Sequence, residues 1–212
     1  MSKILILIFL AFSASLLSAG YSIKDYKYLV GSLEGINPST LEMHLTLYQG
    51  YVKNTNALEE MLSKTDDRSI AYGALKRRLA WEFDGMVLHE LYFENLGGKR
   101  PLQPKSALYK AIEKNFGSFE KWRQNFFATG MIRGIGWVIL YIDPVSKQLH
   151  NIWVDDHHIN HIAGGVPLLV MDVWEHAYIT EYGLNREGYI GAFYKNIDWK
   201  AVETRYSQGI LK

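Results

Sequence analysis

An apolar run near the carboxyl end of the chain stops at a carboxylate and an imidazole. The segment PLLVMDVWEHAYITEYG, residues 167–183, is typical of a buried strand that ends at Asp172, and His176 follows four positions later. A carboxylate in apolar surroundings is a costly charge unless a cation or hydrogen-bond donors compensate it. The pattern therefore favours a site where Asp172 and His176 bind a positively charged group.

Two more histidines lie in the first half of the chain, where the sequence predicts long helices. His44 has Tyr48 and Tyr51 at i+4 and i+7, so the three side chains share one helical face. His89 lies among apolar residues in FDGMVLHELYF, residues 83–93. Two antiparallel helices can bring one inward histidine from each to a common point.

Three neutral imidazoles and one carboxylate form a borderline-hard ligand set for a divalent or trivalent cation, with a coordination position left for solvent. Each residue also has a purely structural interpretation. His44 and His89 are individually typical of core histidines, and Asp172 alone is typical of a strand-end cap. Spacing alone leaves the shared metal site and the structural interpretation both open.

The segment WVDDHHINHIAGG, residues 153–165, carries a second group of histidines. His157 and His161 are four residues apart, a spacing that could chelate a separate surface metal. The alternative interpretation is that His158 and His161 are surface or packing residues.

The first half of the chain has the pattern of two long helices in a hairpin. Ser39 and Glu42 have the spacing of a capping box, and helical periodicity then continues to Met61. A second helical pattern covers residues 69–95, and the glycines and prolines of residues 94–107 interrupt it.

The second half is mixed. We expect helices at residues 107–115 and 119–129, strands within 136–154 joined by a turn at 143–147, a third strand at 166–171 and a helix-rich tail. The predicted fold class is α+β: an N-terminal helical-hairpin domain, residues 21–100, precedes a C-terminal α/β metal-binding domain, residues 101–212, with a small three-stranded antiparallel sheet.

Composition narrows the class of protein. With 212 residues, 48% apolar and 14% aromatic, the chain is long and apolar enough for a substantial core. A formal charge of +1 gives no indication of a nucleic-acid partner. The absence of cysteine excludes a disulfide framework and a thiolate site.

Residues 1–20 have the order of a cleaved signal peptide. Lys3 gives a basic start, residues 4–17 are mostly apolar, and Ser18, Ala19 and Gly20 are small. The apolar run is shorter than the roughly 20 residues that a bilayer span needs. We therefore expect a periplasmic or secreted protein with no stable membrane association after cleavage.

Five motifs together resemble the iron/manganese superoxide dismutases in order and spacing. They are LEMH (41–44), LHELYFENLGG (88–98), GIGWVIL (134–140), DVWEHAY (172–178) and YIGAFYKNIDW (189–199). The resemblance extends over about residues 25–210. It implies an enzyme that converts superoxide to dioxygen and hydrogen peroxide, with one iron or manganese ion per subunit. The implied ligands are His44, His89, Asp172 and His176, with water or hydroxide as the fifth.

The resemblance also implies residues around the metal. Tyr51 matches the family's gateway tyrosine, but its interval from His44 is one residue shorter than usual, so we expect the helix to bulge or shift. Gly85 stands where some members supply a glutamine to the bound solvent. His157 then takes that role, as in the archaeal-type branch, and its titration near neutrality would make the tuning pH-sensitive.

Further positions follow from the same resemblance. Trp137 and Trp174 are expected to wall the site, with Phe93 beside His89. Glu175 is expected to reach the metal-bound histidine of a partner subunit, which predicts a homodimer or higher homo-oligomer. Tyr48 and Ile179 occupy the places of a histidine–tyrosine pair that often crosses that interface in the family. Asn185 occupies the place of an arginine near the family's substrate funnel, and Arg186 follows it.

Two other functions are compatible with parts of this pattern. A non-catalytic metal-holding or interaction protein could share the fold and the ligands. A di-metal helical oxidase needs several inward glutamates and Glu-x-x-His pairs, which the sequence lacks. Iron and manganese use the same ligands here, so the sequence does not choose between them.

Overall fold

The computed structural model describes residues 20–211, so the predicted signal peptide lies outside the described residues except for Gly20. The elements in chain order are η1 (Lys27–Leu29), α1 (Pro38–Ser63), α2 (Ile70–Glu94), α3 (Ala107–Phe116), α4 (Phe119–Gly130), β1 (Gly136–Ile142), β2 (Leu149–Asp155), β3 (Val166–Asp172), η2 (Glu175–Ala177), α5 (Ile179–Tyr182), α6 (Arg186–Lys195) and α7 (Trp199–Leu211). None of the helices among these residues has both the length and the apolarity to cross a bilayer.

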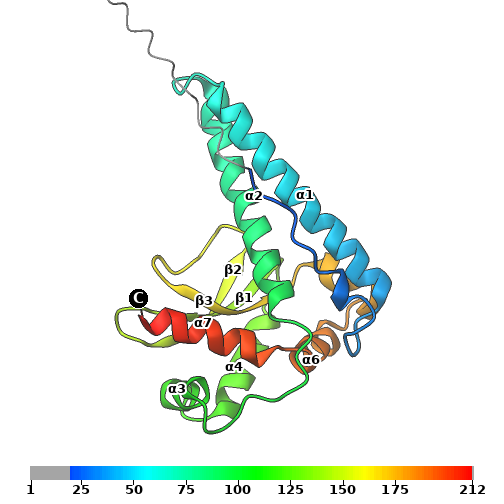
Figure 1. Ribbon diagram of the computed structural model, residues 1–212, viewed down its shortest axis with the longest axis vertical. Helices are drawn as coiled ribbons and strands as arrows, with labels where there is room; N and C mark the ends of the chain where they lie inside the picture. The colour runs from blue at the N-terminus through cyan, green and yellow to red at the C-terminus, as the bar shows by residue number, and fades with distance from the viewer. Residues whose placement is uncertain (1–19, 212) are drawn as a thin grey trace, which may run out of the picture.

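The two long helices α1 and α2 pack side by side as a hairpin whose far end projects beyond the rest of the molecule (Figure 1). The predicted capping box at Ser39 and Glu42 is wrong. Helix α1 begins one residue earlier, at Pro38, after Asn37, and no side chain caps it. Proline suits the first helical position because its φ is preset and its missing N–H has no partner to lose there.

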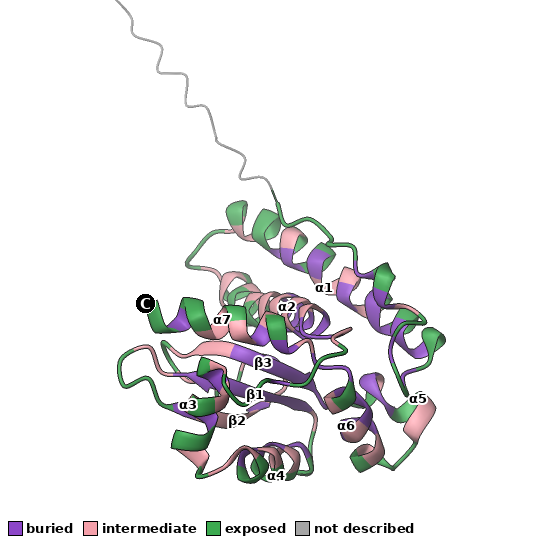
Figure 2. Ribbon diagram, turned by 60° about the horizontal axis from the view of Figure 1, so that its bottom comes forward, coloured by how far each residue is buried: buried purple, intermediate pink, exposed green. Residues whose placement is uncertain are grey.

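The predicted three-stranded antiparallel sheet is confirmed, with strand order β2-β1-β3. All seven residues of the central strand β1 are buried. Helices α2 and α7 lie on one side of the sheet, and α3 and α4 lie on the other (Figure 2). This double cover explains why β1 is apolar at successive positions instead of alternating.

Helix α2 is tied to β3 by a buried amide at its carboxyl end. Asn95 accepts from the Val170 N–H at 2.9 Å and donates to the Val170 carbonyl at 3.2 Å. These bonds connect the hairpin to the strand that ends at Asp172, and one apolar cluster continues through both halves. The boundary between residues 100 and 101 stays a prediction.

Candidate metal centre

Three parts of the fold bring four predicted ligands together. His44 comes from α1, His89 from α2, and Asp172 and His176 from the end of β3 and the following η2. One ligand atom from each lies within 4.8 Å of all the others. The sheet fixes Asp172 directly, since it pairs with Trp137 at the last register position of β1 and β3.

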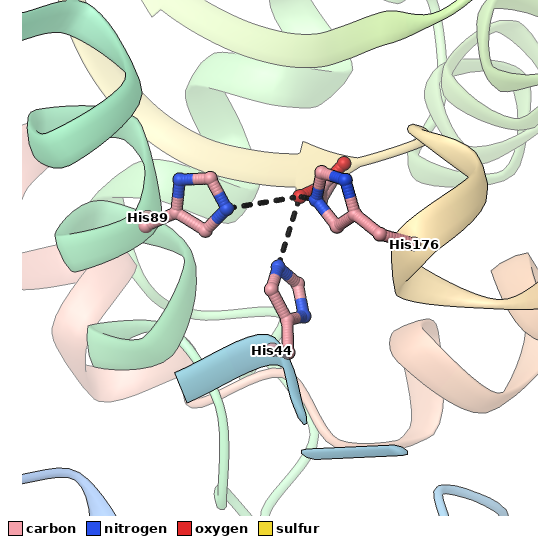
Figure 3. Close-up of side chains that lie close together, drawn as sticks. His44, His89 and His176 are labelled. Carbon is pink, nitrogen blue, oxygen red and sulfur yellow. Dashed lines mark hydrogen bonds and ion pairs between the residues drawn. The ribbon is translucent and has the colours of Figure 1, made fainter. Parts of the chain in front are cut away.

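The three imidazoles converge on one carboxylate oxygen (Figure 3). Asp172 Oδ2 lies 3.0 Å from Nε2 of both His44 and His176, and 3.6 Å from Nε2 of His89. The other oxygen, Oδ1, accepts the Trp174 backbone N–H at 2.8 Å. Asp172 and His89 have no exposed surface, so this carboxylate depends on its neighbours for compensation.

The hydrogen bond on the far side of the His89 ring fixes its tautomer. Nδ1 lies 2.5 Å from the Gly85 carbonyl, which only accepts, so Nδ1 carries the proton. Nε2 of the neutral ring then carries a lone pair in place of a hydrogen, and this atom is buried without a hydrogen-bond partner. This lone pair faces the carboxylate of Asp172, so the donor set fits a cation bound among these atoms.

The electrostatics keep the ligands in the forms that bind metals. Burial lowers the pKa of His44 and holds that of His89 well below its usual value. Burial alone would raise the pKa of Asp172, but His176 and His44 outweigh it and leave that pKa below its usual range. His44 and His89 are therefore neutral and Asp172 ionised near neutral pH, and no proton has to be displaced from them.

Tyr51 reaches this region without the predicted bulge, because α1 is a continuous helix from Pro38 to Ser63. Its ring stacks on His89, with 5.0 Å between ring centroids. A Cβ at Gly85 would lie 2.7 Å from Tyr51 Cδ1. The glycine on α2 therefore gives the ring its space, and the helix of Tyr51 does not have to shift.

His157 connects Tyr51 to Trp137. The Trp137 indole N–H donates to His157 Nδ1 at 3.1 Å, and an indole cannot accept in return. In the neutral ring Nε2 therefore carries the proton and donates to the Tyr51 oxygen at 2.7 Å. The phenolic hydrogen of Tyr51 remains free to donate elsewhere.

The expectation that His157 titrates near neutrality is wrong. Its side chain has no exposed surface, and burial lowers its pKa to about 4. The Trp174 ring stacks on it at 4.6 Å, and the Trp81 ring contacts its edge at 5.2 Å between centroids. His157 is therefore a neutral hydrogen-bond donor across the physiological range.

Aromatic rings surround the ligands. The Trp137 ring lies 5.0 Å from that of His89, and the Trp174 ring lies 5.7 Å from that of His176. Phe93 packs against His44 at 5.1 Å. Apolar walls of this kind exclude water and strengthen the polar contacts inside them.

The positions linked to a subunit interface differ in their exposure to solvent. Tyr48 is 1% exposed, donates to Glu90 at 2.9 Å and accepts the Lys24 N–H at 3.1 Å, so its hydroxyl is used within the chain. Glu175 and Ile179 are exposed.

The two residues expected near the substrate funnel have structural contacts. Arg186 donates to the carbonyls of Ile132 and Gly134 and to the Tyr178 hydroxyl. Asn185 accepts the Gly188 N–H and caps α6. The Arg186 guanidinium is therefore committed to holding a loop.

A separate surface metal site at His157, His158 and His161 is not supported. Among residues 20–211, only the four predicted ligands form a cluster of metal-binding geometry. His161 directs its two ring nitrogens at the Tyr141 hydroxyl and the His157 carbonyl.

Sequence reasoning missed a tyrosine pair behind Asp172. The Tyr189 hydroxyl donates to the Asp172 carbonyl at 2.7 Å and lies 3.2 Å from the Tyr92 hydroxyl. Both residues are fully buried or nearly so. Tyr189 opens the YIGAFYKNIDW segment, and that position at the start of a motif was the available signal.

Comparisons with known proteins agree with this geometry. Residues 104–205 match the family model for the C-terminal domain of iron/manganese superoxide dismutases. Superoxide dismutase [Fe] of Cupriavidus metallidurans is 35% identical over 196 residues, 90% of this chain and 98% of the relative. Superoxide dismutase [Mn] 2 of Haloferax volcanii is 36% identical over 170 residues, 79% and 84% of the two chains. Superoxide dismutase [Fe] of Aquifex pyrophilus is 37% identical over 190 residues, 84% and 88%. This chain therefore belongs to the iron/manganese superoxide dismutase family.

Proposed function

We propose that this enzyme converts superoxide to dioxygen and hydrogen peroxide at one iron or manganese ion bound by His44, His89, Asp172 and His176. The observation that carries the proposal is the buried, unpartnered Nε2 of His89, which faces the Asp172 carboxylate at 3.6 Å. Family membership supports the same activity.

When bound, the ion supplies the reversible one-electron chemistry that the two half-reactions need. The protein contributes a ligand set that carries one negative charge, from Asp172, because His44 and His89 are held neutral by burial. A divalent or trivalent ion then keeps a net positive charge in the site. That charge attracts the superoxide anion.

Formation of hydrogen peroxide takes up two protons, which come from water, and Tyr51 is placed to direct its phenolic hydrogen at the reacting oxygen. Burial, with the nearby charge of Asp172, raises the pKa of Tyr51, so the phenol stays protonated. Its oxygen accepts from His157, which leaves the phenolic hydrogen available to a reacting oxygen. His157 orients the phenol and does not change its own charge.

The test is reconstitution of the purified protein with iron and with manganese, each followed by elemental analysis and an assay of superoxide removal. We expect about one ion per chain and fast, salt-sensitive turnover with at least one metal. The variant His176→Ala is expected to lose both, whereas His150→Ala, on β2, serves as the matched histidine control. Full metal occupancy without turnover in either form would instead identify a metal-holding protein.

The choice between iron and manganese is a separate question. Relatives that carry either metal in their names resemble this chain to a similar degree. We therefore propose that the ligand set accepts both ions, with supply deciding occupancy. Competition with equal amounts of the two metals during refolding, read by elemental analysis, measures the preference; strict exclusion of one would contradict the proposal.

We also propose that the enzyme assembles as a homodimer or higher homo-oligomer through the surface around Glu175. Glu175 lies on η2 beside the ligand His176, and nearby Ile179 is a 42% exposed apolar side chain. Light scattering of the wild type and of Glu175→Ala tests this. A wild type that is monomeric at micromolar concentration would overturn it.

Finally, we propose that the protein is exported and loses residues 1–20. The basic, apolar and small residues of that segment support this. Mass spectrometry of the native protein locates the mature start, and cell fractionation locates the protein. Retention of Met1 on a protein in the cytoplasmic fraction would contradict the proposal.

A further inference from the structure

The loop between β2 and β3 holds His157 in an unusual turn. Asp155 and Ile159 exchange two backbone hydrogen bonds, at 3.1 and 3.3 Å, around the residues between them. Asp156 has a φ of 50°, a left-handed conformation that non-glycine residues rarely adopt. A turn with such a conformation needs support from its surroundings to keep a single geometry.

Side chains hold the peptide groups on both sides of His157. The Trp174 indole N–H donates to the Asp156 carbonyl at 3.1 Å. His161 Nε2 lies 2.8 Å from the His157 carbonyl. Because these two carbonyls flank the Cα of His157, the pair of contacts fixes its backbone and therefore the direction of its ring.

The tautomer of His161 follows from its partners. A peptide carbonyl only accepts, so Nε2 of His161 carries a proton. In the neutral ring Nδ1 is then an acceptor, and the Tyr141 hydroxyl, 2.6 Å away, donates to it. Tyr141 is 3% exposed and lies on β1 at a register shift between β1 and β3, so it is a rigid anchor.

We propose that His161, oriented by Tyr141, is a positioning residue that holds His157 and, through it, Tyr51. The order of contacts is Tyr141 to His161, His161 to the His157 carbonyl, and His157 Nε2 to the Tyr51 oxygen. None of these contacts joins His161 directly to a metal ligand or to a reacting atom. The inference rests on the proposed function only where it concerns turnover.

The decisive comparison is between His161→Leu and His161→Gln in the metal-loaded, full-length mature protein. Leucine removes the donor, whereas the glutamine amide nitrogen can occupy the place of Nε2 and donate to the same carbonyl. We expect His161→Leu to lower kcat/KM about 10-fold, as is usual for residues that orient a metal site from outside, and His161→Gln to restore most of it. His150→Leu is the matched control.

A second readout does not depend on activity. Loss of the His161 bond loosens the turn, so hydrogen exchange of the Ile159 amide is expected to rise by up to about 10-fold in His161→Leu and to return in His161→Gln. Exchange in the middle of α1 is expected to stay unchanged. If His161→Leu does not fold, Tyr141→Phe removes the anchor with the loss of one oxygen and is measured in the same way.

Wild-type exchange and kcat/KM in a folded His161→Leu would overturn the proposal. So would a His161→Gln variant that remains as impaired as His161→Leu, because the donor would then not be what matters. A wild type that binds metal but has no turnover would contradict the proposed function alone, since the exchange measurements would still decide whether His161 holds the turn.

Discussion

Nε2 of His89 and Oδ2 of Asp172 face each other at 3.6 Å in a buried site, with no proton available on the nitrogen to join them. Nδ1 carries the single N–H of the neutral imidazole and donates it to the Gly85 carbonyl, so the lone pair of Nε2 is directed at an ionised carboxylate. A bound cation between the two removes this conflict.

Metal binding is therefore expected to stabilise the native state. An ion that binds only the folded protein raises the free energy of unfolding by about 2.7 kcal/mol at a free concentration 100 times its Kd. Chemical denaturation with and without manganese measures the difference. His176→Ala lacks one ligand and is expected to show little dependence on the metal; an equal gain in this variant would mean that the ion binds elsewhere.

The contact between Gly85 and Tyr51 predicts opposite effects for two glycine substitutions on α2. In Gly85→Ala the new methyl group would lie 2.7 Å from the Tyr51 ring, and overpacking of this kind costs roughly 1–3 kcal/mol. Superoxide removal is expected to fall as Tyr51 is displaced.

The control is Gly73→Ala on the same helix, where a Cβ meets nothing within 4 Å. This change is expected to stabilise by about 0.5–1 kcal/mol, because alanine is the better helix former. Urea denaturation of both variants checks the prediction. Equal stability of the two would show that the space beside Tyr51 is not limiting.

Trp137→Phe tests how the His157 tautomer is set. The change removes the one donor to His157 Nδ1 among residues 20–211 and leaves a buried nitrogen unsatisfied, which costs about 1–3 kcal/mol. His157 can then protonate Nδ1 and accept from Tyr51, which reverses the bond between them. We expect roughly a 10-fold lower kcat/KM with metal content retained. An unchanged kcat/KM would show that the function of Tyr51 does not depend on the Trp137 N–H.

The stability of the metal-free protein is expected to fall as the pH is lowered from neutral. The folded-state pKa of His157 is about 4, below the unfolded value near 6.5, so the unfolded chain binds the proton first. The contribution of buried, neutral His157 to the free energy of unfolding is present above pH 6.5 and is lost as the pH falls from 6.5 to about 4. One such histidine gives a slope of up to about 1.4 kcal/mol per pH unit.

His44 and His89 have lowered pKa values for the same reason and add to this slope. Denaturation curves of wild type and His157→Gln across pH 4–8 separate the contribution of His157. We expect the variant to show the shallower dependence. If the free energy of unfolding depended on pH equally in both proteins, His157 would have the same pKa in the folded and unfolded states.

Much of the architecture was accessible from local patterns. Ser69 caps α2 through the Tyr72 N–H, and that helix begins at Ile70, one residue after the start of the predicted helical pattern. The strands were found because β-branched and aromatic runs are separated by turn residues. The start of α1 was missed because a proline at the first helical position outweighed a side-chain cap.

The errors around Tyr51 and His157 have a tertiary origin. The spacing from His44 to Tyr51 lies within one helix, but the space for the ring is provided by Gly85 on another. The lowered pKa of His157 comes from burial among aromatic rings of separate elements. Neither packing relationship leaves a signal in the local sequence.

Anomalous X-ray scattering from crystals of the purified protein, measured at the iron and manganese absorption edges, tests the central claim most directly. We predict a single strong peak per chain, within bonding distance of Nε2 of His44, His89 and His176 and of an Asp172 carboxylate oxygen. Metal-loaded, active protein whose peak lies away from these four side chains would contradict the account, as would a peak that persists unchanged in His176→Ala.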